Sequence, residues 1–201
     1  KTKRLNKKYV LSLVIIVLFA CLNAHAQNVL VGLTSNGSVD GKGTAFSINT
    51  NGNNFSVIEG FEDWGNTPNG SFYLDDDGYF YGMTHSGGTY NNGTIFKMSA
   101  DGKVTMLKQF NYNVDGAYPD GELIKGEDGY LYGLTSSGGV NGYGTIFKIS
   151  ASGDFSVIKS LSVNTDGGGA RGHLTLAKDG NFYGITCTGG STGYGTIFKL
   201  T

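Results

Sequence analysis

Residues 132–139 read YGLTSSGG and residues 144–148 read GTIFK, and these two segments decide the fold. Both return along the chain, as YGMTHSGG (81–88) with GTIFK (93–97) and as YGITCTGG (183–190) with GTIFK (195–199). A degenerate first copy reads VGLT (31–34) with GTAF (43–46). From Gly32 the steps between copies are 50, 51 and 51 residues. A repeat that keeps its phase in this way predicts a tandem-repeat architecture.

Each period divides into four strand-like stretches separated by turn residues. In the best copy they are residues 130–135, 144–150, 155–161 and 172–176. Within the third stretch, Phe155, Val157 and Leu161 share one face by the two-residue alternation of a strand. Asp-Gly and Ser-Gly pairs favour two-residue hairpin turns, because Gly accepts positive φ. These pairs are Asp77-Gly78, Asp101-Gly102, Asp128-Gly129, Ser152-Gly153 and Asp179-Gly180.

The composition agrees with a fold of short strands and many turns. The 201 residues include 34 Gly, only 2 Pro and 25 aromatic side chains, and so much Gly disfavours long helices. We predict an all-β, β-propeller-like array of four-stranded antiparallel blades of about 50 residues. The chain would supply about 14 strands, an incomplete ring of about 3.5 blades, so further C-terminal repeats or an anchor module are expected. A β-sandwich-like or solenoid stack is the alternative.

The paired Y-G-x-T and G-T-I-F-K elements resemble the Gloeo/Verruco (GloVer) tandem repeat of choice-of-anchor exported bacterial proteins. The resemblance covers essentially the whole chain after residue 26 and is best from Gly121 to Lys148. The first copy departs from it, with Val31 in place of Tyr and Ser47 in place of Lys. The resemblance implies an exported, surface-associated repeat protein and brings no catalytic or ligand-binding residues.

The first 26 residues read as an export signal. Five basic residues lie within residues 1–8 and an apolar run follows at residues 10–20, too short to span a bilayer comfortably. Ala24-His25-Ala26 is an A-x-A cleavage site. We therefore expect a signal peptide at 1–26, a repeat domain at 27–201 and a periplasmic, outer-surface or extracellular location. The alternative is a lipoprotein with Cys21 as the lipidated residue. The repeats fall at about 31–80, 81–131, 132–182 and, in part, 183–201.

Charge and cysteine content narrow the choice of partners. Residues 27–201 carry 10 basic and 16 acidic side chains, a net charge of −6. Without a basic cluster, a nucleic acid or an anionic membrane surface is not an expected partner. Cys187 is the one cysteine left after residue 26, so no disulfide is expected within the mature chain. Ser136 and His85 occupy the equivalent positions in the two preceding repeats. We therefore interpret Cys187 as a small residue at a variable position of the repeat and not as a nucleophile.

No set of residues in the sequence points to catalysis, a metal or a cofactor. Asp77, Asp128 and Asp179 recur beside Gly, so turn geometry explains them. After residue 26, His85 and His173 lie in different repeat positions and lack an HxxxH or HExxH partner. The Gly-Gly pairs lack the context of a phosphate-binding loop. We therefore expect no catalytic residues, no metal site and no cofactor.

Function in a repeat protein tends to lie in residues that differ between copies. The longest link between strands varies most, and it holds Trp64, Asp63, Tyr112 and Tyr118. Aromatic rings flanked by Asn and Asp suit the apolar face and polar edges of a sugar. These four residues are the predicted ligand-binding residues, although Trp64 and Tyr118 could instead pack beneath the loop. The favoured hypothesis is an exported, non-enzymatic scaffold that binds a glycan or a protein at the cell surface.

Two other functions remain open. The first is a propeller-type hydrolase or lyase with a carboxylate pocket at a central channel. It requires Glu59, Glu62, Asp63 and Glu122 to converge in space. The second is a structural spacer within a larger adhesin, which the sequence does not separate from a binding scaffold.

Overall fold

The computed structural model describes residues 29–38, 40–62 and 64–201, and in these residues the chain is all-β. The predicted signal peptide and Cys21 lie outside the described residues. Among the residues described, no helix is long and apolar enough to cross a membrane bilayer. The strands are β1 (Val29–Thr34), β2 (Thr44–Asn49), β3 (Ser56–Gly60), β4 (Tyr73–Leu74), β5 (Phe80–Thr84), β6 (Thr94–Met98), β7 (Val104–Gln109), β8 (Ala117–Lys125), β9 (Leu131–Ser137), β10 (Thr145–Ile149), β11 (Phe155–Ser160), β12 (Gly168–Leu176), β13 (Phe182–Thr188) and β14 (Ile197–Leu200).

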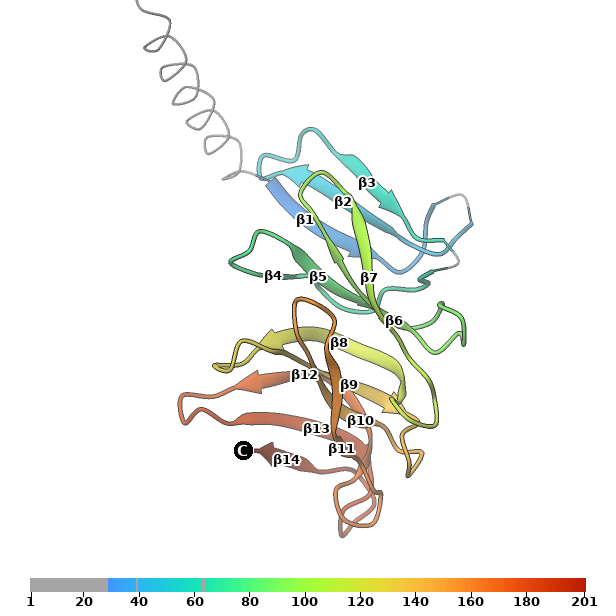
Figure 1. The fold of residues 1–201 in the computed structure, drawn as a ribbon, viewed down its shortest axis with the longest axis vertical. Coiled ribbons are helices and arrows are strands. Elements are labelled where there is room, and N and C mark those ends of the chain that lie inside the picture. Colours follow the sequence, from blue (N-terminus) through green and yellow to red (C-terminus); the bar gives the residue numbers. More distant parts are fainter. Residues whose placement is uncertain (1–28, 39, 63) are drawn as a thin grey trace, which may run out of the picture. The chain divides into compact units, whose positions relative to one another are not determined.

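The strands form four antiparallel sheets, and in each sheet the order of the strands is their order in the sequence (Figure 1). The first sheet is β1-β2-β3, the second β4-β5-β6-β7, the third β8-β9-β10-β11 and the fourth β12-β13-β14. Sheets of three or four consecutive antiparallel strands are the blades of a propeller. The predicted propeller-like array of about 50-residue blades is confirmed.

The chain divides into two compact units. Residues 32–46 and 57–201 form the larger one, apart from residues 39 and 63, which are not described. The described part of the smaller unit consists of residues 29–31 and 47–56. The second, third and fourth sheets lie wholly in the larger unit, and every site considered below belongs to it.

The two sequence anchors face one another across the middle of each sheet. Gly133 on β9 pairs with Phe147 on β10, and a Cβ atom at Gly133 would lie 2.4 Å from Phe147 Cζ. Two residues on, the hydroxyls of Thr135 and Thr145 are 2.9 Å apart and fully buried. The same Gly–Phe and Thr–Thr pairs recur in the second and fourth sheets. The spacing of the anchors is therefore the register of one strand pair.

The Asp-Gly turns differ from the predicted two-residue hairpins. At the β8–β9 turn the Gly126 N–H donates to Tyr130 O at 2.9 Å, and the Gly129 N–H donates to Gly126 O at 3.0 Å. The loop therefore holds three residues, a tight turn followed by a left-handed residue. That residue is Gly129, with φ of 81°, while Asp128 keeps negative φ and uses its carboxylate to accept the Tyr130 N–H.

The innermost strand of the fourth sheet begins earlier than predicted. We expected residues 172–176, whereas β12 runs from Gly168 to Leu176. Gly168 and Ala170 pair with Thr188 and Thr186 on β13. The pairing is then interrupted between Arg171 and Thr175, where the register shifts. The Gly-rich start of this strand carries no alternating pattern, so only its partner strand reveals it.

Two equivalent hydrophobic cores lie between successive sheets of the larger unit. One joins the second and third sheets and the other joins the third and fourth, where Figure 1 shows β12 beside β8 and β9. Their fully or nearly fully buried members include, respectively, Tyr81, Met83, Ile95, Phe110, Leu123 and Phe147, and Leu134, Ile146, Leu161, Ala170, Leu174 and Phe182. The third sheet thus buries one face on the second sheet and the other on the fourth.

Candidate functional site

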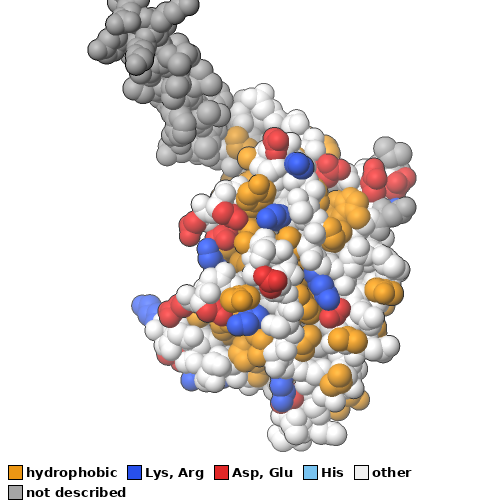
Figure 2. All heavy atoms as spheres, in the orientation of Figure 1, with side chains coloured by type: hydrophobic (Ala, Val, Ile, Leu, Met, Phe, Trp, Pro, Cys, Tyr) orange, Lys and Arg blue, Asp and Glu red, His pale blue; other side chains and the backbone are white. Residues whose placement is uncertain are grey.

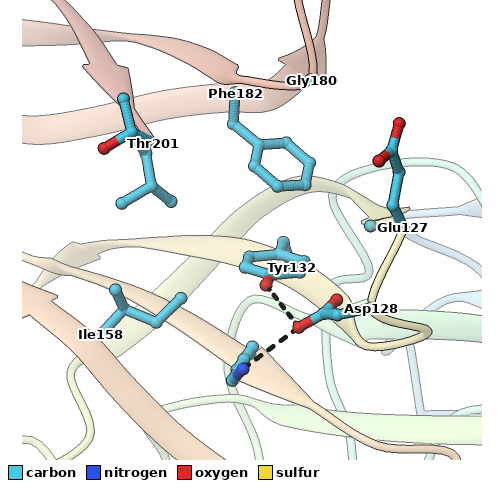
Figure 3. Close-up of a pocket in the computed structure, with 10 residues that line it drawn as sticks. Glu127, Asp128, Tyr132, Ile158, Gly180, Phe182 and Thr201 are labelled. Atoms are coloured by element: carbon cyan, nitrogen blue, oxygen red, sulfur yellow. Dashed lines mark hydrogen bonds and ion pairs between the residues drawn. The ribbon is translucent and has the colours of Figure 1, made fainter.

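In the second, third and fourth sheets, a carboxylate at the turn between the first two strands accepts a hydrogen bond from a tyrosine, and in the third and fourth sheets it also lies near a lysine. In the third sheet, Asp128 Oδ2 accepts hydrogen bonds from the Tyr132 hydroxyl at 2.9 Å and from Lys148 Nζ at 3.2 Å (Figure 3). In the fourth sheet, Asp179 Oδ2 accepts from Tyr183 at 2.9 Å and lies 3.6 Å from Lys199 Nζ. In the second sheet, Asp77 accepts from Tyr81 at 2.7 Å.

These contacts shift the pKa values of both partners. Burial alone would raise the pKa of Asp128, but the hydrogen bonds from Tyr132 and Lys148 outweigh burial and lower it. Hydrogen bonds from Asn181 and Tyr183 lower the pKa of Asp179 to about 2. Burial and the hydrogen bond to Asp128 raise the pKa of Tyr132 to about 12. An ionised acid and a neutral phenol are thereby fixed at neutral pH, which suits a structural clamp and not proton transfer.

A cavity of about 410 Å³ lies beside this clamp, between the third and fourth sheets. Its lining includes Glu127, Asp128, Tyr132, Ile158 and Phe182, and the Phe182 ring lies 4.5 Å from the Tyr132 ring (Figure 3). One repeat earlier, Lys97 Nζ donates to Ala151 O at 3.0 Å, and Lys125 forms an ion pair with Asp75. At the junction of the third and fourth sheets the positions of Lys125 and Asp75 hold Leu176 and Gly126, so this ion pair does not recur there.

A second, polar pocket of about 320 Å³ is formed by three loops of the larger unit. The β1–β2 loop supplies Lys42 and the β3–β4 link supplies Glu62 and Asn66. Gly87, Gly88 and Asn91 come from the β5–β6 loop. The lining thus combines an ammonium group, a carboxylate and two amides, which can both donate and accept hydrogen bonds.

Backbone hydrogen bonds hold the three loops of this pocket together. Asn66 and Ser86 exchange N–H···O bonds of 2.9 and 3.1 Å, and the Thr67 N–H donates to Lys42 O at 3.0 Å. Within the β5–β6 loop, the Gly87 N–H donates to Asn91 Oδ1 at 2.9 Å. Because the loops are tied to one another, the pocket needs little ordering to receive a ligand.

The two asparagine side chains of this pocket do not recur along the chain. One repeat on, Ala117 stands at the position of Asn66 and Gly142 at that of Asn91, and in the next repeat both positions are Gly. Asn91 has a positive φ of 53° and Gly142 one of 81°, so glycine suits this position. Asn91 Oδ1 accepts the Gly87 N–H, whereas one repeat on the Gly138 N–H donates to the backbone oxygen of Gly142. The two amides are therefore particular to this repeat, unlike the recurring Asp–Tyr–Lys clamp.

The family model of the Gloeobacter/Verrucomicrobia repeat matches residues 20–201. The chain belongs to this repeat family. Curated protein sequences give no match. The Gloeobacter/Verrucomicrobia repeat is thus the unit of about 50 residues whose anchors pair in each sheet, and the chain is a repeat scaffold.

The solved structure of TolB supports the fold of these Gloeobacter/Verrucomicrobia repeats. TolB from Acinetobacter baumannii superposes with a TM-score of 0.53 at 15% identity, over 90% of this chain and 42% of that chain. Two putative 6-phosphogluconolactonases, from Bacteroides uniformis and Bacteroides fragilis, give TM-scores of 0.48 and 0.47 at 12% and 16% identity. Each match covers 87% of this chain and 55% of the other. The chain therefore spans about half the length of these structures, and the likeness concerns the fold alone.

The predicted ligand-binding residues in the first link take different places. Trp64 packs inward, with its ring centroid 5.0 Å from that of Phe61 and 5.4 Å from that of Phe96. Asp63 lies outside the described residues. In the later repeats the position of Trp64 is held by Asp115 and Asp166, each of which accepts a backbone N–H of its own link. The contacts of Trp64 agree with packing beneath the loop, and a binding role for it stays a prediction.

The tyrosines of the second link are not brought together with Trp64 by any contact of the described residues. Tyr118 stacks on His85 at a centroid distance of 5.2 Å and holds a strained φ of 57°. Its N–H donates to Asn92 O at 2.9 Å. The Tyr112 side chain is exposed. Their roles in binding also stay predictions.

Two carboxylates of the enzymatic alternative have different neighbours. Glu62 lines the polar pocket, whereas Glu122 on β8 lies 3.9 Å from His173 on β12. Glu59 belongs to β3. Among the described residues no group of three or more His, Cys, Asp and Glu side chains is placed to hold a metal ion. Cys187 is exposed.

The link singled out in the sequence supplies Glu62 and Asn66 to the polar pocket, but the sequence analysis named neither Asn66 nor Asn91. The signal was present at Asn91, because Gly occupies its position in the two later repeats and a polar residue replaces it here. What the sequence does not contain is the meeting of loops that are about 25 residues apart along the chain.

Proposed function

We propose that this chain is an exported, non-enzymatic repeat scaffold that binds a glycan in the polar pocket of Lys42, Glu62, Asn66 and Asn91. The observation that carries the proposal is the contrast between recurring and non-recurring polar groups. The carboxylates that recur are occupied by Tyr and Lys, while the amides of this pocket are found in one repeat only.

The chemistry of the pocket suits a polyhydroxylated ligand. Sugar hydroxyls both donate and accept hydrogen bonds, and amides, a carboxylate and an ammonium group match both needs. The pocket is polar and open, so a ligand would bind by its edges, with ordered water filling the remaining contacts. Tyr90, in the same loop as Asn91, is exposed and could add a stacking face.

Export is the second part of the proposal. It rests on the basic start, the apolar run and Ala24-His25-Ala26 in the sequence. Expression in a Gram-negative host followed by fractionation and intact mass would test it. A mature chain that begins at Gln27 supports export with cleavage after Ala26. A lipidated chain that begins at Cys21 supports export but moves the cleavage site to the bond before Cys21. An uncleaved cytoplasmic chain overturns the proposal of export.

The binding test uses a glycan array followed by titration of the best glycan. The decisive variant is the double substitution Asn66→Ala and Asn91→Gly, which installs the residues of the following repeat and so respects the scaffold. We expect at least a tenfold loss of affinity with an unchanged urea midpoint. Val140→Ala, in the equivalent loop of the next repeat, is the matched control and should bind normally, because Val140 is exposed and lies outside the pocket.

Two results would overturn the glycan assignment. One is an array with no binding glycan. The other is a glycan that binds the double variant as tightly as the parent chain, because its site would then lie elsewhere. Turnover of a bound glycan would favour the hydrolase or lyase alternative over a binding scaffold.

A further inference from the structure

The fourth sheet exposes a face that is buried in the two preceding sheets. Leu134 and Ile146 of the third sheet are 1% and 3% exposed, and Met83 and Ile95 of the second sheet are equally buried. The matching residues of the fourth sheet, Ile185 and Ile197, are 53% and 81% exposed. In the earlier sheets this face is covered by the next repeat, so the structure itself shows what kind of surface fits it.

Backbones approach closely where that cover begins. A Cβ atom on Gly70 would lie 1.8 Å from Gly121 O, and one on Gly121 would lie 2.2 Å from Gly172 O. These glycines follow one another at steps of 51 residues. A Cβ atom on Gly172 meets no described atom within 4 Å. Gly70, Gly121 and Gly172 thus form a glycine column, in which Gly70 and Gly121 each leave room for the backbone of the next repeat. Gly172 is the last of the three, and no described backbone lies on the side where its Cβ atom would point.

A backbone hydrogen bond also crosses each junction at a fixed place. The N–H of Thr67 donates to Lys42 O at 3.0 Å, that of Tyr118 to Asn92 O at 2.9 Å, and that of Gly169 to Tyr143 O at 3.0 Å. The next carbonyl in this series belongs to Tyr194, a residue that is 89% exposed. The acceptor for a following repeat is thus presented at the surface.

Polar and charged side chains lie on both sides of the glycine column and contact one another from one repeat to the next. Asn69 Nδ2 donates to Asp120 Oδ1 at 2.7 Å, and Asp120 lies 4.0 Å from Arg171. On the other side of the column, Glu122 lies 3.9 Å from His173. Arg171 and His173 are more than half exposed at the free end of these two rows.

We infer that the open face of the fourth sheet docks a further blade of the same repeat, continuous with this polypeptide. The inner strand of that blade would carry glycine over Gly172, with acid or amide side chains opposite Arg171 and His173. Its link would donate an N–H to Tyr194 O, and its apolar face would cover Ile185 and Ile197. A continuous blade is favoured because every junction in the larger unit joins repeats that are consecutive in sequence.

The test appends a copy of residues 100–150 directly after Thr201, which preserves the 51-residue register. This segment places copies of Asp120 and Glu122 opposite Arg171 and His173. Cys187 is exposed and shares a face of β13 with Ile185. In a Cys21→Ser background, the rate at which a thiol reagent labels Cys187 therefore measures whether this face is covered. We expect the extension to slow labelling of Cys187 at least tenfold, to raise the urea midpoint and to leave the chain monomeric.

The matched control appends the same segment with Gly121→Val in the copy, so that a side chain blocks the approach to Gly172. It should leave Cys187 as reactive as in the parent chain. Full reactivity of Cys187 in the unaltered extension would overturn the inference. Concentration-dependent protection of Cys187 in the 201-residue chain, with a dimer in sedimentation, would also overturn it, because a second copy would then be the occupant.

Discussion

The third and fourth sheets have nearly the same sequence pattern but very different surroundings. Both carry the Y-G-x-T and G-T-I-F-K anchors, and both pair Gly with Phe and Thr with Thr in the same register. Yet the isoleucine after the second Thr is buried in β10 and exposed in β14. The comparison shows that the anchors fix the geometry within a sheet, while the neighbouring sheet decides what each residue contributes to stability.

The largest difference is expected for a charge on the shared face. Ile146→Asp would bury an unpaired carboxylate between the third and fourth sheets and should lower the free energy of unfolding by more than about 3 kcal/mol. Ile197→Asp places the same group in water and should change it by less than about 0.5 kcal/mol. Urea denaturation followed by tryptophan fluorescence measures both. Equal losses would mean that the fourth sheet is covered in solution.

A smaller difference is expected for the glycine column. Gly121 and Gly172 both have positive φ, 79° and 73°, so Ala strains the backbone at either position. At Gly121 the new methyl also meets Gly172 O, whereas at Gly172 it meets no described atom. Gly121→Ala should therefore cost about 2 kcal/mol more than Gly172→Ala. Equal urea midpoints for the two variants would contradict this prediction, because they would show that the backbone at the junction shifts to fit the methyl group without a loss of stability.

The buried hydroxyls rank next. Thr145 Oγ1 is 2.9 Å from Thr135 Oγ1 and donates to Asp115 O at 2.8 Å, all shielded from water. Thr145→Val keeps the shape of the side chain but removes the hydroxyl that bonds Thr135 Oγ1 and Asp115 O. It should lower the free energy of unfolding by about 1–3 kcal/mol. Thr196→Val in the fourth sheet should cost less, because water reaches the partly exposed Thr196. Thermal unfolding of the pair measures the ranking, and a larger shift for Thr196→Val would reverse it.

The smallest effect concerns pH. The Tyr132 pKa is raised to about 12 in the fold, whereas an unfolded tyrosine ionises near pH 10. The unfolded chain thus binds fewer protons between these values, so this contribution to stability is complete below pH 10 and is lost as the pH rises toward 12. Tyr132→Phe should flatten the fall in unfolding free energy over this range. Tyr183→Phe should also flatten this fall, because the hydrogen bond to Asp179 raises the pKa of Tyr183 as well. A slope unchanged by Tyr132→Phe contradicts the assignment.

Much of the fold could be predicted from the sequence because its anchors act locally. Gly133 and Phe147 are opposite one another, so their spacing along the chain already contains the β9–β10 register. The start of β12 at Gly168 could not be predicted, because glycines carry no pattern and the partner strand defines them. The turn type was also missed, since Gly takes the left-handed position and leaves Asp128 to bind Tyr132.

The candidate site was less predictable than the fold. Variation between copies directed attention to the link that supplies Glu62 and Asn66 to the polar pocket, but the direction in which a side chain points depends on tertiary packing. Trp64 turns toward Phe61 and Phe96, two rings that its own sequence neighbourhood only partly supplies. The pocket arises where Asn66 and Asn91 meet across hydrogen bonds between loops, and such a meeting has no signature in one sequence.

The strand order within the sheets also determines how the chain can fold as it emerges. Each strand pairs with its neighbour in the sequence, so a sheet needs no segment that has yet to be synthesised. Contacts between residues close in sequence form quickly, because little loop entropy is lost. Folding can therefore proceed sheet by sheet from the N-terminal side, and each folded sheet offers an apolar face on which the next sheet packs.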